Sequence, residues 1–132
     1  MCLTPLQAST LPSSMQRTLA LQLAVKCADL GHMASSWSIH QAWVDRLQQE
    51  LHSQGDLELA HSLPTSPMCD RNGACLRDGQ VGFIDSVVVP MMWSYLQVFP
   101  QSAPQLLQTL SNRQQWAALS ASQQQQQQPR LE

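Results

Sequence analysis

The chain has 132 residues, of which 43% are hydrophobic and 12% are charged, and its formal net charge is −2. This length suits one domain or part of one, and the charge argues against a nucleic-acid module, which carries a basic patch. The N-terminus does not resemble a secretory leader, and we expect no apolar run near the roughly 20 residues that span a bilayer. The four cysteines form no Cys-x-x-Cys pair and indicate free thiols in a reducing compartment. We therefore expect an intracellular, cytoplasmic protein with no membrane anchor.

The first regular element is expected after a short irregular segment. Residues 1–13 mix Ser, Thr and Pro with scattered leucines and lack a sustained period, so we expect them to be loosely ordered. Ser13 or Ser14 can cap a helix over residues 15–30, whose apolar positions recur at helical spacing on a broad stripe. Gly31 suits the end of that helix.

A second helix and a long loop follow. The helix is predicted from Ser35 or Ser36 to Gln54, with Gly55 as its stop. Residues 56–79 then contain Pro, Asp, Asn and Gly at turn positions. Such a segment is long for a loop in a compact domain, and loops of this length are often functional.

Two further helices precede a polar tail. Residues 80–99 show apolar positions every three or four residues, and Pro90 should bend this helix because it lacks an amide hydrogen. The valines at 87–89 leave a strand open, although the length of the pattern favours a helix. Pro104 can open a fourth helix, after which residues 121–132 form a Gln-rich, low-complexity tail. The fold class is therefore all-α, with disordered termini.

Asp29 is the first candidate for chemistry, at the end of a mostly apolar helix. Gln22, Lys26 and Asp29 follow one another at helical spacing, so Asp29 could be solvated or weakly paired with Lys26. Spacing alone favours that interpretation over a metal ligand, because one acid without a ligand cluster is weak support for a metal site.

The four histidines lack the His-x-x-x-His spacing that places two imidazoles on one helical face. A metal site built from this chain alone is therefore not expected. His40 lies on an apolar stripe and is interpreted as a satisfied core residue. His32 follows the predicted helix end at Gly31 and is better placed to meet something bound near Asp29.

Gln80 and Phe83 are a candidate pair for nucleobase binding. They stand three residues apart on one helical side, where an amide could match the edge of a base and an aromatic ring could stack on its face. Spacing alone favours a commoner arrangement, in which Gln80 is solvated at a helix N-terminus and Phe83 belongs to the core.

In order along the chain, these segments resemble the C-terminal half of the catalytic domain of class I cyclic-nucleotide phosphodiesterases. The resemblance covers about residues 19–118. It is carried by Lys26-Cys27-Ala28-Asp29-Leu30, Trp43-Val44-Asp45 with Glu50, Gln54-Gly55-Asp56, Leu63-Pro64, Ser66-Pro67-Met68-Cys69-Asp70-Arg71, Gln80-Val81-Gly82-Phe83-Ile84-Asp85, Pro90, Asn112-Arg113 and Trp116. Single pieces are weak, but their order and spacing make chance agreement very improbable.

The resemblance implies an all-helical domain that hydrolyses the 3′ phosphoester of cAMP or cGMP with two metal ions, typically zinc and magnesium. It implies that Asp29 is the last metal-ligand aspartate, that Gln80 grips the purine and that Phe83 clamps it. His32 falls where the family varies a residue near the base. On this basis residues 14–120 form a partial catalytic domain, with the cyclic nucleotide as its partner.

The departures from the family pattern concern the catalytic residues. The resemblance places the other metal ligands and the general-acid histidine upstream of the matched segment, and the sequence contains no His-Asp dipeptide. The family's Glu-Glu-Phe-Phe stretch appears here as Gln49-Glu50-Leu51-His52, and the loop between Asp70 and Gln80 looks shortened. We therefore expect no catalytic residue in this chain and no activity from it alone. The alternative is a non-catalytic helical module that binds a nucleotide or a protein partner, such as the missing N-terminal half.

Overall fold

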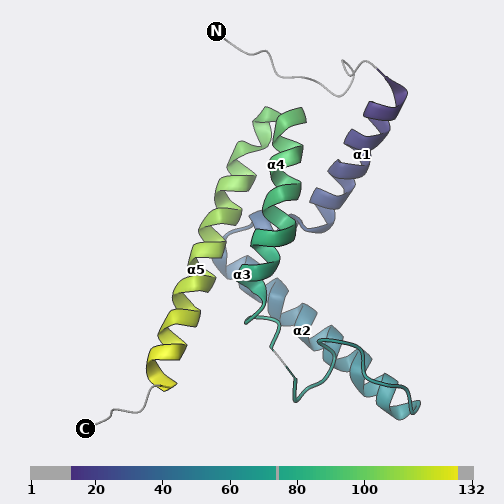
Figure 1. Cartoon of the computed structure of the whole chain (residues 1–132), viewed down its shortest axis with the longest axis vertical. Coiled ribbons are helices and arrows are strands. Elements are labelled where there is room, and N and C mark those ends of the chain that lie inside the picture. Colours follow the sequence, from purple (N-terminus) through teal and green to yellow (C-terminus); the bar gives the residue numbers. More distant parts are fainter. Residues whose placement is uncertain (1–12, 74, 128–132) are drawn as a thin grey trace.

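The computed structural model describes residues 13–73 and 75–127, and its described part is helical without a strand (Figure 1). The elements are α1 (Ser14–Asp29), the 3-10 helix η2 (Gly31–Ala34), α2 (Trp37–Ala60), α3 (Gln80–Phe83), the π-helical segment η3 (Ile84–Val88), α4 (Val89–Val98), the 3-10 helix η4 (Pro100–Ser102) and α5 (Ala103–Gln127). The all-α prediction is confirmed.

Helix α1 begins at the predicted cap. The Ser13 hydroxyl accepts a hydrogen bond from the backbone amide of Gln16 at 3.2 Å, and the Ser13 amide donates to Oε1 of Gln16 at 3.0 Å. This reciprocal capping box satisfies two amides that the first turn leaves without partners. The helix ends at Asp29, and Gly31 opens the 3-10 turn that leads into α2.

Helix α2 differs from the prediction at its C-terminal end. It passes through Gly55 and ends at Ala60, so the interpretation of Gly55 as a stop was wrong. Gly55 is buried, and a Cβ there would overlap the backbone carbonyl oxygen of Cys69. The glycine therefore provides space for the loop after α2 and does not end the helix.

The third predicted helix is present but irregular. Its first turns are α3 and the π-helical η3, and α4 continues from Val89, so the strand alternative at 87–89 was wrong. The wide turns lie directly before Pro90, whose missing amide cannot form a regular helical hydrogen bond. Pro104 lies in the first turn of α5, as predicted. That helix continues to Gln127, inside the segment that the sequence assigns to a tail.

The predictions for the two ends of the chain fall partly outside the described residues. Residues 1–12 and 128–132 are not described, so the loose N-terminal segment and the end of the Gln-rich tail stay predictions.

One expectation about membranes needs correction. Among the described helices, the continuous run Gln80–Val98 is long and apolar enough to cross a membrane by length and composition. Within the chain, α4 packs against both α1 and α5. The expectation that no apolar run approaches spanning length was therefore wrong, although a single helix of this kind is weak evidence for a membrane span.

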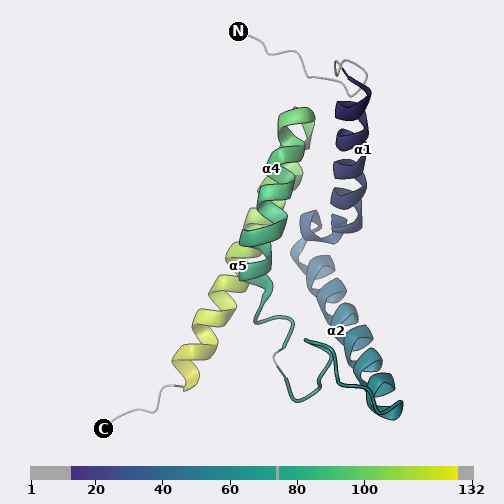
Figure 2. The ribbon, with the colours of Figure 1, turned by 45° about the vertical axis from the view of Figure 1, so that its right-hand side comes forward.

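The core lies where α5 meets η2, α2 and the α3–α4 run. Figure 2 shows α1 and α2 following one another on one side, with α4 and α5 side by side on the other. The buried cluster consists of Met33, Val44, Leu76, Ile84, Val88, Met92, Leu106 and Trp116. Its members come from segments as far apart as η2 and α5, so this core joins residues that are distant in sequence.

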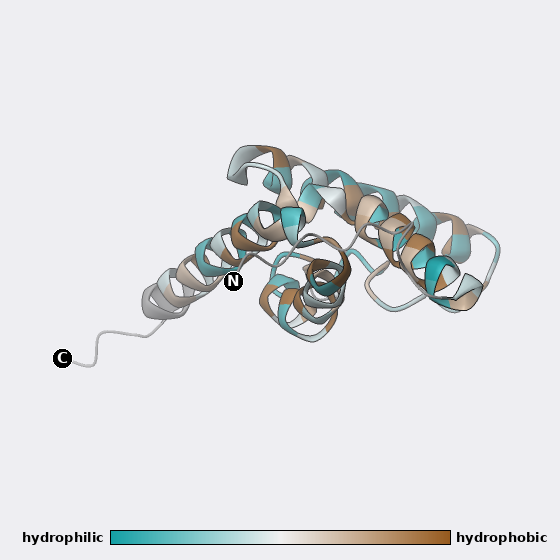
Figure 3. Cartoon of the chain, turned by 90° about the horizontal axis from the view of Figure 1, so that it is seen from above, coloured by the Kyte–Doolittle hydropathy of each residue, from teal (hydrophilic) through white to brown (hydrophobic). Residues whose placement is uncertain are grey.

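Many large apolar side chains remain on the surface. Exposure reaches 70% for Met15, 63% for Leu21 and 66% for Leu107. Seen from above in Figure 3, brown, hydrophobic stretches recur along the helices. Where such side chains are contiguous, they are candidates for contact with another polypeptide segment.

Candidate functional site

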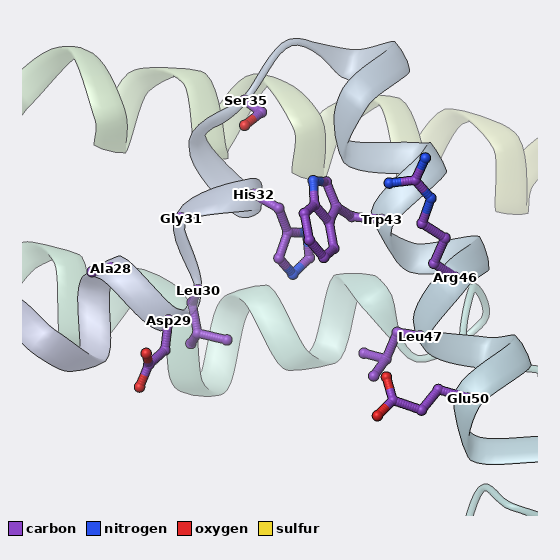
Figure 4. Close-up of a pocket in the computed structure, with 10 residues that line it drawn as sticks. All are labelled: Ala28, Asp29, Leu30, Gly31, His32, Ser35, Trp43, Arg46, Leu47 and Glu50. Atoms are coloured by element: carbon purple, nitrogen blue, oxygen red, sulfur yellow. The ribbon is translucent and has the colours of Figure 1, made fainter.

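A pocket of about 450 Å³ lies between the end of α1, η2 and the first half of α2 (Figure 4). Its lining residues are Ala28, Asp29, Leu30, Gly31, His32, Ser35, Trp43, Arg46, Leu47 and Glu50. The sequence predicts Asp29 and His32 as site residues, and the structure brings both to this pocket. The two residues lie close together because α1 ends at Asp29 and the tight η2 turn reverses the chain immediately afterwards.

The Asp29 side chain is exposed at the pocket margin. No ion pair in the described part of the chain includes Asp29 or Lys26, so the weak pairing considered from the sequence is not formed. Figure 4 shows the Asp29 carboxylate at one side of the pocket and that of Glu50 at another side. Asp29 is thus available to a ligand.

The described residues do not fit a complete metal centre. Within residues 13–73 and 75–127, no three His, Cys, Asp or Glu side chains gather closely enough to hold a metal ion. A divalent metal needs several such ligands or bound waters in a fixed geometry. Asp29 can supply one carboxylate, and the remaining ligands would have to come from elsewhere.

His32 is the partly buried end of a hydrogen-bond series that runs into the core. Its Nδ1 lies 3.2 Å from Nδ1 of His40, and Nε2 of His40 accepts a hydrogen bond from the Trp116 indole N–H at 2.8 Å. His40 has no exposed surface, and burial together with the adjacent His32 lowers its pKa to about 4. Burial also lowers the pKa of His32. The interpretation of His40 as a satisfied core residue agrees with these contacts.

Gln80 and Phe83 lie away from the lining of this pocket. Gln80 is 3% exposed and donates from Nε2 to the Leu76 carbonyl at 3.2 Å, while its Oε1 atom is buried without a partner. Phe83 is 36% exposed. The common arrangement, with a solvated glutamine and a core phenylalanine, was therefore wrong for both residues. Their nucleobase role stays a prediction.

The α2 wall of the pocket was not predicted from the sequence. Trp43, Arg46 and Glu50 line it, and the Arg46 guanidinium carbon lies 5.8 Å from the centre of the Trp43 ring. These positions are spaced three and four residues apart, so they share one side of α2. That spacing could have identified the wall, but nothing in it indicates that the side faces Asp29.

The model of the 3′5′-cyclic nucleotide phosphodiesterase family matches residues 6–110. The chain belongs to this family. A probable 3′,5′-cyclic phosphodiesterase of Caenorhabditis elegans is 41% identical over 63% of this chain and 12% of its own length. The 3′,5′-cyclic-AMP phosphodiesterase 4C of Mus musculus is 36% identical over 76% of this chain and 15% of its own length.

The helical arrangement is also that of a solved family domain. The phosphodiesterase domain of Salpingoeca rosetta rhodopsin phosphodiesterase superposes with a TM-score of 0.77 at 31% identity, covering 86% of this chain and 35% of that chain. The present chain therefore spans about a third of the solved domain. Family members use divalent metal ions, whereas the described residues of this chain supply no complete site for one.

Proposed function

We propose that this chain is the C-terminal part of a 3′,5′-cyclic-nucleotide phosphodiesterase catalytic domain, which in complete form hydrolyses cAMP or cGMP to the 5′-nucleotide. The observation that carries the proposal is the family match over residues 6–110 together with the meeting of Asp29 and His32 in one pocket. Asp29 would provide one ligand of a centre expected to hold zinc and magnesium. His32, Gln80 and Phe83 would contact the nucleotide.

The chain alone should not hydrolyse cyclic nucleotides. One carboxylate cannot hold two metal ions, and the described residues contain no cluster that could supply the other ligands. No residue of the chain is assigned as the general acid that would protonate the departing oxygen. We expect that the purified chain shows no turnover above buffer with added Zn²⁺ and Mg²⁺.

A chimaera tests the role of the fragment in a complete domain. Residues 19–118 of this chain would replace the matched segment of the Salpingoeca rosetta phosphodiesterase domain, which the chain resembles with a TM-score of 0.77. We expect metal-dependent hydrolysis of a cyclic nucleotide by the chimaera. Asp29→Asn should lower it about 100-fold or more, because a lost ligand removes charge stabilisation in the transition state.

The matched control is Asp78→Asn, which removes an exposed carboxylate outside the pocket. It should leave turnover unchanged. Equal losses from the two substitutions, or full activity of Asp29→Asn, would overturn the assignment of Asp29. Metal-dependent turnover by the isolated chain would overturn the expectation that it is inactive.

The second candidate function is a non-catalytic helical module, and the exposed apolar surface favours it. Met15, Leu21 and Val25 on α1 are each more than half exposed. Such a surface could bind the N-terminal half of the domain or another protein. A binding test with labelled cAMP and cGMP on the isolated chain separates a module that keeps a nucleotide pocket from one that only binds protein. Binding of either nucleotide would favour the first kind of module, and no binding would favour the second.

A further inference from the structure

A second hollow lies between α1 and the corner where α4 meets α5. It has an inner chamber of about 110 Å³ and an outer chamber of about 290 Å³. Both chambers are lined by Cys27, Tyr95, Ser102 and Gln105, so they adjoin and form one groove, which we call the α1–α4 groove. All of its walls come from described residues of this chain.

The α1–α4 groove is separate from the pocket that contains Asp29. Ala28 lines the outer chamber as well as that pocket, and Gly31 lines the inner chamber as well as that pocket. No other described residue lines both hollows. The end of α1 and the start of η2 therefore divide the two spaces, and the proposed function makes no use of the groove.

The walls of the groove carry no charge. Among the described residues, no Asp, Glu, Lys, Arg or His lines either chamber. The pocket on the other side of the turn differs, because Asp29, Arg46 and Glu50 line it. A charged ligand would lose hydration in the groove without gaining an ionic partner, and that exchange is unfavourable. The groove therefore selects an uncharged ligand.

Aromatic rings form one side of the groove, and small side chains form the other. Tyr95 and Phe99 line it from the end of α4, with ring centres 4.7 Å apart and an angle of 42° between their planes. Ala24 and Ala28 line it from α1, and Met92 lines the inner chamber. Aromatic rings make favourable tilted contacts with other rings, and methionine sulfur makes favourable contacts with ring edges. These walls favour an aromatic ligand over a saturated one of similar size.

The groove also offers polar atoms that have no partner. Tyr95 and Gln105 line both chambers, and neither side chain forms a hydrogen bond within the described part of the chain. Both side chains can donate and accept. Ser102 is already engaged, because its hydroxyl donates to the Phe99 carbonyl at 2.7 Å. A hydrogen-bonding substituent on the ligand would therefore meet Tyr95 or Gln105.

The size of the groove limits the ligand to one ring. An apolar cavity of about 150 Å³ can hold benzene, and pockets for drug-sized molecules measure about 300–1,000 Å³. The inner chamber is smaller than the first value, and the outer chamber lies at the lower end of the second range. A single ring that lies across both chambers, with its substituent in the outer one, fits these volumes.

We propose that the α1–α4 groove binds a small uncharged ligand built on one aromatic ring with a hydrogen-bonding substituent, such as an aromatic amide. The ring lies against Tyr95 and Phe99, and the substituent bonds to Gln105. This proposal does not rest on the proposed function.

Benzamide is the probe, and the sample is the full 132-residue chain labelled with ¹³C at the methionine methyl groups. Met92 lines the inner chamber, whereas Met68 is exposed and lines neither chamber. A bound aromatic ring should shift the Met92 methyl signal through its ring current. We expect a saturable shift with a dissociation constant on the order of 1–10 mM, because the ligand has few atoms. No saturable shift of Met92, or the same shift for Met68, overturns the proposal.

Two further probes test the chemical class of the ligand. Benzoate has nearly the shape of benzamide but carries a charge, and it should bind at least about 10-fold more weakly. Cyclohexanecarboxamide keeps the amide but lacks the aromatic ring, and it should bind about 5-fold more weakly. Equal affinity of benzoate and benzamide overturns the selection for an uncharged ligand. Equal affinity of the two amides overturns the selection for an aromatic one.

A substitution that fills the groove tests the location. Cys27→Leu adds side-chain volume where both chambers meet and should weaken benzamide binding about 10-fold or more. Cys75→Leu is the matched control, because Cys75 is exposed and lines neither chamber. It should leave the affinity unchanged. A folded Cys27→Leu variant that binds benzamide as well as the unmodified chain contradicts the proposal.

Alkylation of the unmodified chain provides a test that needs no variant, in case Cys27→Leu does not fold. The rates at which iodoacetamide modifies Cys27 and Cys75 are measured by mass spectrometry. Saturating benzamide should slow the modification of Cys27 about 5-fold and leave Cys75 unchanged. An unchanged rate at Cys27, or equal slowing at both cysteines, contradicts binding in the groove.

Two other occupants of the groove would give different results. If a second copy of the chain filled it, the Met92 methyl signal would shift with protein concentration in the absence of benzamide. If residues 1–12 filled it, nuclear Overhauser contacts would join them to the Met92 methyl group. Either result overturns the assignment to a small ligand. A Met92 signal that shifts only with benzamide supports it.

Discussion

Gly55 lies inside α2 against the backbone carbonyl of Cys69, at a position where a β-carbon would overlap that oxygen. The contact joins the second half of α2 to the loop that follows it. The loop then returns along the helix toward α3, and Arg71 pairs with Asp56 beside the contact.

Gly55→Ala should therefore destabilise the chain. The loop backbone would have to move, and overpacking of this kind costs about 1–3 kcal/mol. Urea unfolding followed by circular dichroism measures the change. The control is Gly82→Ala, because a β-carbon at Gly82 in α3 meets nothing within 4 Å. That substitution should raise stability by about 0.5–1 kcal/mol, and a loss of stability equal to that of Gly55→Ala would contradict the role of the Cys69 contact.

Asn112 holds the turn that carries His32. Its Nδ2 donates to the carbonyls of Met33 and Ser35, each at 2.9 Å, and the side chain is fully buried. Asn112→Leu removes both hydrogen bonds and leaves the Ser35 carbonyl without this donor, while the Met33 carbonyl keeps the Thr109 hydroxyl. The substitution should lower the free energy of unfolding by about 2–4 kcal/mol, since a buried unpaired polar group costs about 1–3 kcal/mol and a lost hydrogen bond about 1 kcal/mol. The midpoint of urea unfolding provides the test.

Thr109→Val is the matched control for this substitution. The Thr109 hydroxyl lies 3.2 Å from the same Met33 carbonyl, which would keep its bond from Asn112. The control should cost about 1 kcal/mol, the net worth of one hydrogen bond. A larger loss from Thr109→Val than from Asn112→Leu would show that the turn is not held mainly by Asn112.

The stability of the chain should fall as the pH is lowered from neutral. The pKa of His40 is lowered from 6.5 to about 4, so the unfolded chain takes up a proton at higher pH than the folded chain does. This contribution is present above pH 6.5 and is lost as the pH falls toward 4. Between pH 7 and pH 5 it should remove about 2 kcal/mol of the free energy of unfolding.

The His40→Gln variant isolates this effect, because the glutamine side chain at position 40 does not titrate. Unfolding by urea at a series of pH values should show a shallower dependence for the variant than for the unmodified chain. Parallel curves for the two proteins would assign the pH dependence to other groups.

Removing residues 121–132 should leave the stability unchanged. Between Trp116 and Ser122 no side chain of α5 is buried, and the side chains of Ala121 and Ser122 are exposed. Thermal unfolding of the full and shortened chains should give the same midpoint. A clear drop in the shortened chain would show that the Gln-rich segment contributes packing.

Local patterns in the sequence predicted most helix boundaries because capping and chain-breaking act over a few residues. Ser13 begins α1 through its own side chain, and Pro104 lies in the first turn of α5. Gly55 shows where local reasoning fails. Its flexibility suggested a helix end, but the contact that requires glycine comes from Cys69, which is distant in sequence.

The candidate site was likewise predictable only in part. The order of motifs along the chain was enough to identify the family, because that order does not depend on side-chain positions. The side chains around Asp29 were not predictable, since Trp43 and Arg46 reach the pocket only through the reversal at η2. In the structure Gln80 is buried and Phe83 is exposed, which is the opposite of the arrangement that spacing alone favours.

By itself the sequence determined the all-α fold class, the family and Asp29 as the residue to examine, because periodicity and motif order are properties of the linear chain. Only the tertiary structure decided the environment of His32. Trp116 lies 76 positions from His40 in sequence and meets it only when α5 packs against α2. The surroundings of a histidine ring are set by the hydrogen-bond partners that packing supplies, and no local pattern contains them.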